Sequence, residues 1–149
     1  MGELILLIPV LLLTLASVID LRTREIPDWI SVALIAVGVT AAAQGWADIQ
    51  WWMVVTGTFI GFAVGFGLFR FASFGGGDAK LITGVGAILG PVGLWFFLMW
   101  MALAGGALAL AANYRGKGQC AYGPAILIGY MGFLIFPADM WTTLRNLMQ

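Results

Sequence analysis

The sequence contains no histidine and a single cysteine, Cys120, among its 149 residues. A disulfide within the chain is therefore excluded, and the sequence lacks the Cys/His clusters that hold structural zinc. Without histidine, a serine or cysteine nucleophile would also lack its usual general base. We therefore expect no metal and no cofactor, and any chemistry must come from other side chains.

Charge is also scarce, because only 9% of the residues are charged whereas 62% are hydrophobic. Soluble domains carry about 25% charged residues, so this composition indicates an integral membrane protein in contact with the lipid bilayer. The seven basic and seven acidic residues cancel, which gives no support for nucleic-acid binding. No basic residue precedes the first apolar run, so we expect that run to be a retained span and not a cleaved signal peptide.

Apolar runs separated by short polar stretches predict an all-α, polytopic membrane helix bundle of about six transmembrane helices. We expect one transmembrane domain over residues 1–149. The predicted spans are residues 4–19, 29–43, 51–71, 81–89, 92–112 and 122–141. The fourth is too short to cross a bilayer alone, so a single broken span over 81–112, interrupted at Gly90-Pro91, is the alternative.

The third span carries Gly57, Gly61 and Gly65 at four-residue spacing. This spacing places the three glycines on one helix face and predicts close packing against another helix.

The six-helix arrangement places the loops 20–28, 70–80 and 113–121 on one side of the membrane. These loops hold six of the seven basic residues, namely Arg22, Arg24, Arg70, Lys80, Arg115 and Lys117. The positive-inside rule therefore predicts that this side faces the cytoplasm, with both termini outside.

Two aspartates fall on that cytoplasmic side at predicted helix ends. Asp20 closes the first apolar run, and Asp78 follows three consecutive glycines. Two neighbouring carboxylates share one proton, so the ionised member can activate water while the protonated member donates to a carbonyl oxygen. We expect an acid–base pair that hydrolyses amide bonds. We assign the shared proton to Asp20, because a helix C-terminus disfavours an anion and a helix N-terminus favours one at Asp78.

Three alternatives stand beside this interpretation. Each aspartate taken singly is explained as a helix cap. A proton-coupled transporter or channel subunit would also use intramembrane acids, but it predicts them near the middle of the membrane. A non-enzymatic membrane protein of an assembly system would not need the aspartates at all.

Three segments of the chain together resemble the type IV prepilin peptidases, which are membrane aspartic proteases with a Gly-x-Gly-Asp motif. The first runs from Asp20 to Asp28, the second from Gly75 to Leu81, and the third begins Tyr122-Gly123-Pro124-Ala125. The resemblance implies that Asp20 and Asp78 are catalytic. It implies substrate-binding or structural support from Gly75, Gly77, Lys80, Tyr122, Gly123 and Pro124. The sequence departs from the family at Asp28, where asparagine is usual, and at Ala121, where proline is usual.

The short chain is similar to the peptidases of tight-adherence (Flp) pilus systems, which implies a peptidase without a methyltransferase domain. The implied substrate is a prepilin or pseudopilin with a short basic leader. Cleavage would occur at the cytoplasmic face of the inner membrane of a prokaryote, just before the apolar helix of the substrate.

Overall fold

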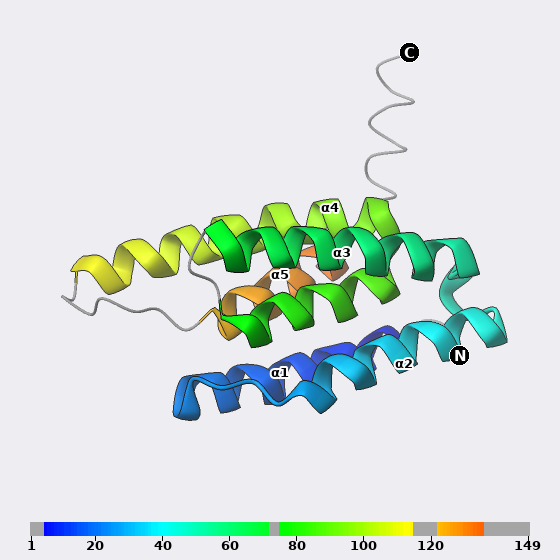
Figure 1. The fold of residues 1–149 in the computed structure, drawn as a ribbon, viewed down its shortest axis with the longest axis horizontal. Coiled ribbons are helices and arrows are strands. Elements are labelled where there is room, and N and C mark those ends of the chain that lie inside the picture. Colours follow the sequence, from blue (N-terminus) through cyan, green and yellow to red (C-terminus); the bar gives the residue numbers. More distant parts are fainter. Residues whose placement is uncertain (1–4, 72–74, 115–121, 136–149) are drawn as a thin grey trace, which may run out of the picture.

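A computed structural model describes residues 5–71, 75–114 and 122–135 as a bundle of helices (Figure 1). The elements within these residues are α1 (Leu7–Thr23), α2 (Asp28–Gln44), the short 3-10 helix η2 (Trp46–Asp48), α3 (Trp51–Phe71), α4 (Gly76–Tyr114) and α5 (Gly123–Ile135). The all-α prediction is confirmed. The last part of the predicted sixth span, residues 136–141, lies outside the described residues, as do the basic residues 115 and 117.

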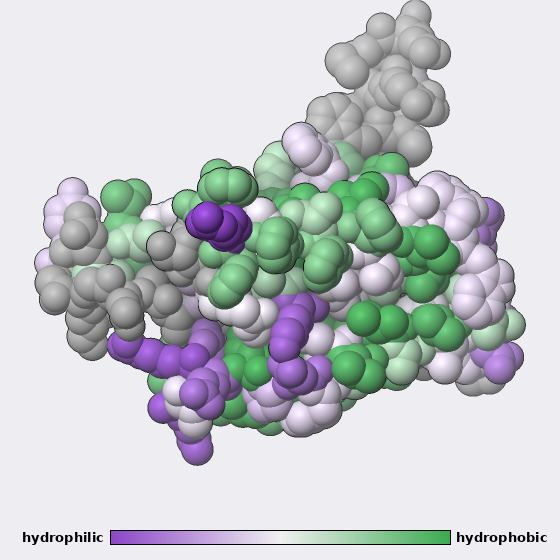
Figure 2. Space-filling model, in the orientation of Figure 1, coloured by the Kyte–Doolittle hydropathy of each residue, from purple (hydrophilic) through white to green (hydrophobic). Residues whose placement is uncertain are grey.

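The helices are apolar on the outside as well as in the core. Two of them are long and apolar enough to cross a membrane, namely α3 and the stretch Gly76–Ala112 of α4. Large hydrophobic side chains are exposed on all five α-helices, and Figure 2 shows how much of one face they cover. Soluble monomers rarely expose large contiguous apolar surface, so this surface agrees with a membrane protein.

Helix α4 is interrupted at Gly90, whose backbone is non-helical with φ 65° and ψ −177°. Glycine accepts a positive φ without steric cost, and Pro91 has no N–H to continue the helical hydrogen bonds. The predicted break at Gly90-Pro91 is therefore confirmed. The predicted fourth and fifth spans are the two halves of α4, so the described chain has five α-helices where six were expected. Figure 1 shows the second half returning toward the end of the bundle where α4 begins.

Contacts between helices bring several element ends together at one end of the bundle. Lys80 of α4 bonds Asp28 of α2, and the start of α5 contacts the last turn of α1. The end of α3 lies there too, because Gly65 packs against Ala79. We call this region, formed by residues 20–28, 75–80 and 122–124, the aspartate end (left in Figure 1).

The glycine stripe of α3 packs directly against the first half of α4. A Cβ atom added at Gly61 would lie 2.9 Å from the carbonyl oxygen of Ile82, and one at Gly65 would lie 2.6 Å from that of Ala79. The two backbones therefore approach more closely than any larger residue would allow, which confirms the predicted packing face. This contact fixes the first turns of α4, which carry Asp78.

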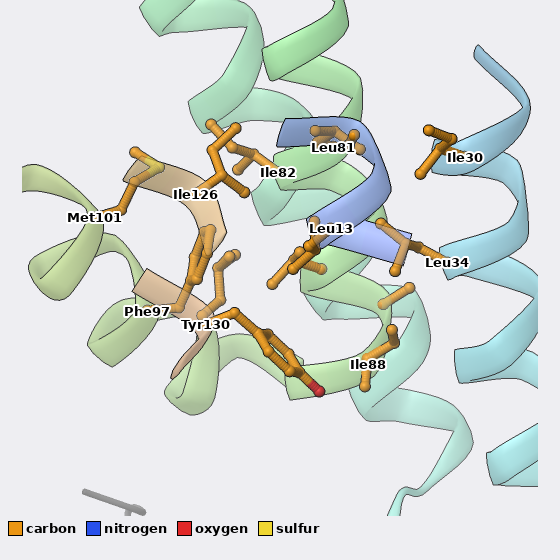
Figure 3. Packing of buried hydrophobic residues seen from close by; sticks show 14 of the residues in the cluster. Leu13, Ile30, Leu34, Leu81, Ile82, Ile88, Phe97, Met101, Ile126 and Tyr130 are labelled. Atoms are coloured by element: carbon orange, nitrogen blue, oxygen red, sulfur yellow. The ribbon is translucent and has the colours of Figure 1, made fainter. Parts of the chain in front are cut away.

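The core joins α1, α2, α4 and α5 (Figure 3). Tyr130 of α5 is completely buried beside Leu13 and Phe97, and its hydroxyl donates a 3.0 Å hydrogen bond to the carbonyl oxygen of Leu6. A buried hydroxyl must find a partner, so this bond fixes α5 along α1. The start of α5 meets the other end of α1, where Gly123 contacts Asp20.

Candidate active site

The sequence predicted that the first helix ends at Asp20. In the structure Asp20 lies within the last turn of α1. The helix continues to Thr23 and ends because Arg24 adopts a left-handed conformation with φ 56°. The Arg24 amide donates a 2.9 Å hydrogen bond to the Asp20 carbonyl oxygen, which closes the helix. Asp20 therefore keeps helical backbone geometry, and its side chain is buried.

The carboxylate of Asp20 is held by the start of α5. The Gly123 amide donates a 2.8 Å hydrogen bond to Asp20 Oδ2 in a buried setting, across 103 residues of sequence. The first amides of a helix have no partner within the helix, and the dipole there is positive, so a carboxylate is stabilised at this position. The sequence argument considered only the dipole of α1, which disfavours an anion at Asp20. The structure adds the N-terminus of α5, which favours one.

Asp78 is the third residue of α4 and is as deeply buried as Asp20, with 6% of its surface exposed. Its carboxylate accepts a hydrogen bond from the backbone of Gly75, the residue that precedes the helix. This is the return contact of a capping box, so the cap interpretation accounts for one interaction of Asp78. It does not account for Oδ1, which is buried and has no hydrogen-bond partner among the described residues.

Both carboxylates line one cavity of about 310 Å³ at the aspartate end. They interact electrostatically there, although they come from different helices. The other lining residues come from the segment after α1 and from the glycine loop: Arg24, Glu25, Ile26, Gly75, Gly76 and Gly77. Two carboxylates that line one cavity and interact electrostatically form an arrangement that can hold and activate a water molecule.

The glycines around Asp78 provide space for this arrangement. A Cβ atom at Gly77 would lie 2.8 Å from the Ile26 side chain, and one at Gly75 would lie 3.0 Å from Asp78 Oδ2. Side chains at these positions would push the segment after α1 away from α4 or displace the carboxylate. Within the described residues, no three His, Cys, Asp or Glu side chains gather as a metal site would require.

The remaining predicted support residues lie around the cavity in different ways. Lys80 does not line it, because its ammonium group bonds Asp28 at 2.7 Å on the outer surface. Tyr122 directly precedes α5, and Pro124 is the second residue of that helix, where a missing N–H costs little. Gly123 of this segment contacts Asp20 through its backbone amide.

Sequence reasoning missed three residues of the cavity wall. All three lie in the Asp20–Asp28 segment that carries the resemblance, but Arg24 was counted only as a basic loop residue, and Glu25 and Ile26 were given no role in the site. Their nearness to Asp20 in the chain was the signal available. It was not sufficient, because the direction of the chain after α1 depends on the unusual backbone of Arg24.

A family model described as the type IV leader peptidase family matches residues 6–110. This chain belongs to that family. The matched range contains both aspartates and ends before the segment that begins at Tyr122. Membership of the type IV leader peptidase family confirms the resemblance that the aspartate motifs indicated.

Two relatives are archaeal proteins named preflagellin peptidase, from Methanococcus maripaludis (strain C6) and Methanocaldococcus jannaschii. Each is 36% identical over 80 residues, which cover 52% of this chain. The match covers 35% of the first relative and 34% of the second, so it spans about a third of their length. No solved protein structure gives a significant match to the chain.

Proposed function

We propose that this chain is an aspartic endopeptidase that removes the short basic leader from type IV prepilins or pseudopilins. One observation carries the proposal: two buried aspartates from separate helices, Asp20 and Asp78, line one cavity at the end of an apolar bundle. Family membership gives the chemistry a substrate class, because the family is named for leader peptidases. The two preflagellin peptidases support a substrate of the same general kind.

In this mechanism Asp20 is the base and Asp78 holds the shared proton. The Gly123 amide and the positive end of α5 stabilise an ionised Asp20. An ionised Asp78 would leave charge on a buried oxygen without a partner, whereas a protonated Oδ1 can donate a hydrogen bond. These contacts favour the reverse of the assignment made from helix ends alone.

Catalysis then needs only these two side chains and water. Asp20 accepts a proton from the water as its oxygen attacks the scissile carbonyl carbon, and Asp78 donates its proton to the carbonyl oxygen. The resulting diol collapses when it returns a proton to one carboxylate and the leaving nitrogen takes one from the other. Peptide hydrolysis is complete and the pair again shares one proton.

We further propose that the two halves of α4 are separate spans, which gives six spans in all. The four described basic residues support the orientation: Arg22, Arg24 and Lys80 belong to the aspartate end, and Arg70 lies in the last turn of α3, the helix end that leads to the glycine loop. By the positive-inside rule that end faces the cytoplasm of a prokaryotic cell. The leader of a substrate would then be cut on the side where it is synthesised.

The test is cleavage of pilin precursors by the purified protein in detergent. We expect the wild type to release the leader, and Asp20→Asn and Asp78→Asn to reduce cleavage to background while both variants still insert in the membrane. Asp48→Asn is the matched control, because Asp48 is exposed in η2 at the opposite end of the bundle. This variant should cleave the precursor as the wild type does. Wild-type cleavage by either active-site variant would refute the assignment.

The transporter alternative gains no support from the positions of the acids. Both aspartates lie at one end of the bundle, and neither lies near the middle of a helix. A non-enzymatic protein would release no leader in this assay even as the wild type, and in cells leader removal would not depend on either aspartate.

A further inference from the structure

Exposed phenylalanines lie on α3 beside its glycine stripe, along the edge where α3 meets α4. Phe62, Phe66 and Phe69 recur at helical spacing and are 59%, 55% and 49% exposed. The rings of Phe62 and Phe66 stack, with centroids 6.1 Å apart. With Gly76, Ala79, Lys80 and Thr83 of α4 they line a groove of about 240 Å³, which we call the phenylalanine groove.

The phenylalanine groove adjoins the candidate active site at one residue. Gly76 lines both the groove and the cavity that holds Asp20 and Asp78. On its other side the groove shares Phe62, Lys80 and Thr83 with a hollow of about 260 Å³ that reaches α2. The Thr83 hydroxyl already donates a 3.0 Å hydrogen bond to the carbonyl oxygen of Ala79, so this face of the groove is effectively apolar.

The charges beside the groove show how it is placed in a bilayer. The Lys80–Asp28 ion pair is exposed, and such groups stay at the level of the membrane surface. From Phe69 to Phe62 the groove descends seven residues of α3, which is about 10 Å at 1.5 Å per residue. It therefore runs from the polar surface, next to the cavity, into the hydrocarbon. Figure 2 shows hydrophilic groups bordered by hydrophobic side chains on the face in view, near the aspartate end.

We infer that the phenylalanine groove binds the apolar helix of the substrate while the leader occupies the cavity. The inference rests on the proposed function, which requires a membrane-anchored chain to present a peptide bond at the aspartate end. A helix lying in the groove enters sideways from the lipid and meets the cavity at Gly76. Because one residue lines both sites, the scissile bond lies within a few residues of the start of that helix. The groove thus positions the cleavage site relative to the start of the apolar helix of the substrate.

The test compares two substrates, a full precursor and a water-soluble peptide with the same leader and cleavage site but no apolar helix. We expect the double variant Phe62→Ala/Phe66→Ala to raise KM for the full precursor about tenfold, which corresponds to about 1.4 kcal/mol. Its kcat/KM for the short peptide should match that of the wild type. Trp95→Ala is the control, because Trp95 is equally an exposed aromatic residue but lies on α4 beyond the break at Gly90.

The outcomes separate the groove from the catalytic proposal. Equal KM values for the precursor in wild type and double variant, or equal losses on both substrates, would overturn the groove. Failure of the wild type to cleave either substrate would overturn the proposed function and this inference together. A photoreactive phenylalanine analogue at Phe66 should crosslink to the precursor in membranes. Crosslinks only to lipid would assign the groove to an acyl chain and overturn the inference.

Discussion

The contact between Gly123 and Asp20 gives the sharpest prediction, which concerns the variant Gly123→Ala. A Cβ atom at this position would lie 2.9 Å from Asp20 Oδ2, 3.0 Å from Asp20 Cβ and 3.1 Å from Ser17 Cα. The last of these is a backbone atom inside α1, so it cannot move aside as the tip of a side chain can. The added methyl group must therefore push α5 from α1 or turn the carboxylate away from the Gly123 amide.

The expected loss follows from the interaction that is removed. A hydrogen bond to a charged group contributes about 1.5–3 kcal/mol, and a catalytic group displaced by about 1 Å can cost about 100-fold in rate. We therefore expect kcat to fall about 10- to 100-fold for precursor cleavage in detergent. KM should stay within about twofold, because on this proposal Gly123 positions the base and does not bind the apolar helix of the substrate.

The control for this variant is Gly106→Ala in the second half of α4, where an added Cβ meets nothing within 4 Å. That change should leave kcat unaltered. Thermal unfolding of both variants in detergent separates lost positioning from lost folding. Wild-type kcat in a folded Gly123→Ala protein would refute the role of the α5 amide.

Three further predictions concern stability, measured by thermal unfolding in detergent. Gly61→Ala should lower the free energy of unfolding by about 1–3 kcal/mol, because the added methyl group overpacks α3 against α4. Gly67→Ala, which has open space around it, should not lower it, and equal effects of the two changes would contradict the packing. Tyr130→Phe should cost about 0.5–1.5 kcal/mol through its lost buried hydrogen bond and leave cleavage intact; no loss of stability would contradict that bond. Asp28→Asn should change stability by less than about 1 kcal/mol, because its pair with Lys80 is exposed, and a larger loss would contradict a surface role.

The parts of the fold that could be predicted depend on residue type and spacing. Gly90-Pro91 predicted the break in α4, because glycine accepts a positive φ and proline has no N–H to continue the helical hydrogen bonds. The glycine stripe of α3 predicted its packing face for a similar reason. The end of α1 was misplaced because Arg24, a residue that rarely has a positive φ, closes the helix where glycine is the usual signal.

The two aspartates could be proposed as a site because acidic residues are rare in an apolar chain and costly to bury. The role of Lys80 could not be predicted in the same way. Its partner Asp28 lies 52 residues earlier on another helix, and nothing in the sequence specifies which acidic group a lysine will meet. Only the packing of α2 against α4 decides that Lys80 faces outward and leaves the cavity to the carboxylates.

The support of Asp20 shows why part of the site has no direct signature in the sequence. Its partner is a backbone N–H, which nearly every residue possesses, so only the missing side chain of Gly123 hints at the contact. The same holds for Gly75 and Gly77, where a Cβ would lie 3.0 Å from Asp78 Oδ2 and 2.8 Å from the Ile26 side chain. None of these three glycines has a positive φ, so the conformational freedom of glycine does not explain them. They allow the backbone to approach within hydrogen-bonding or van der Waals distance of buried groups. Glycines that pack against the buried acidic residues of this bundle are therefore better interpreted as space for the site than as flexible points.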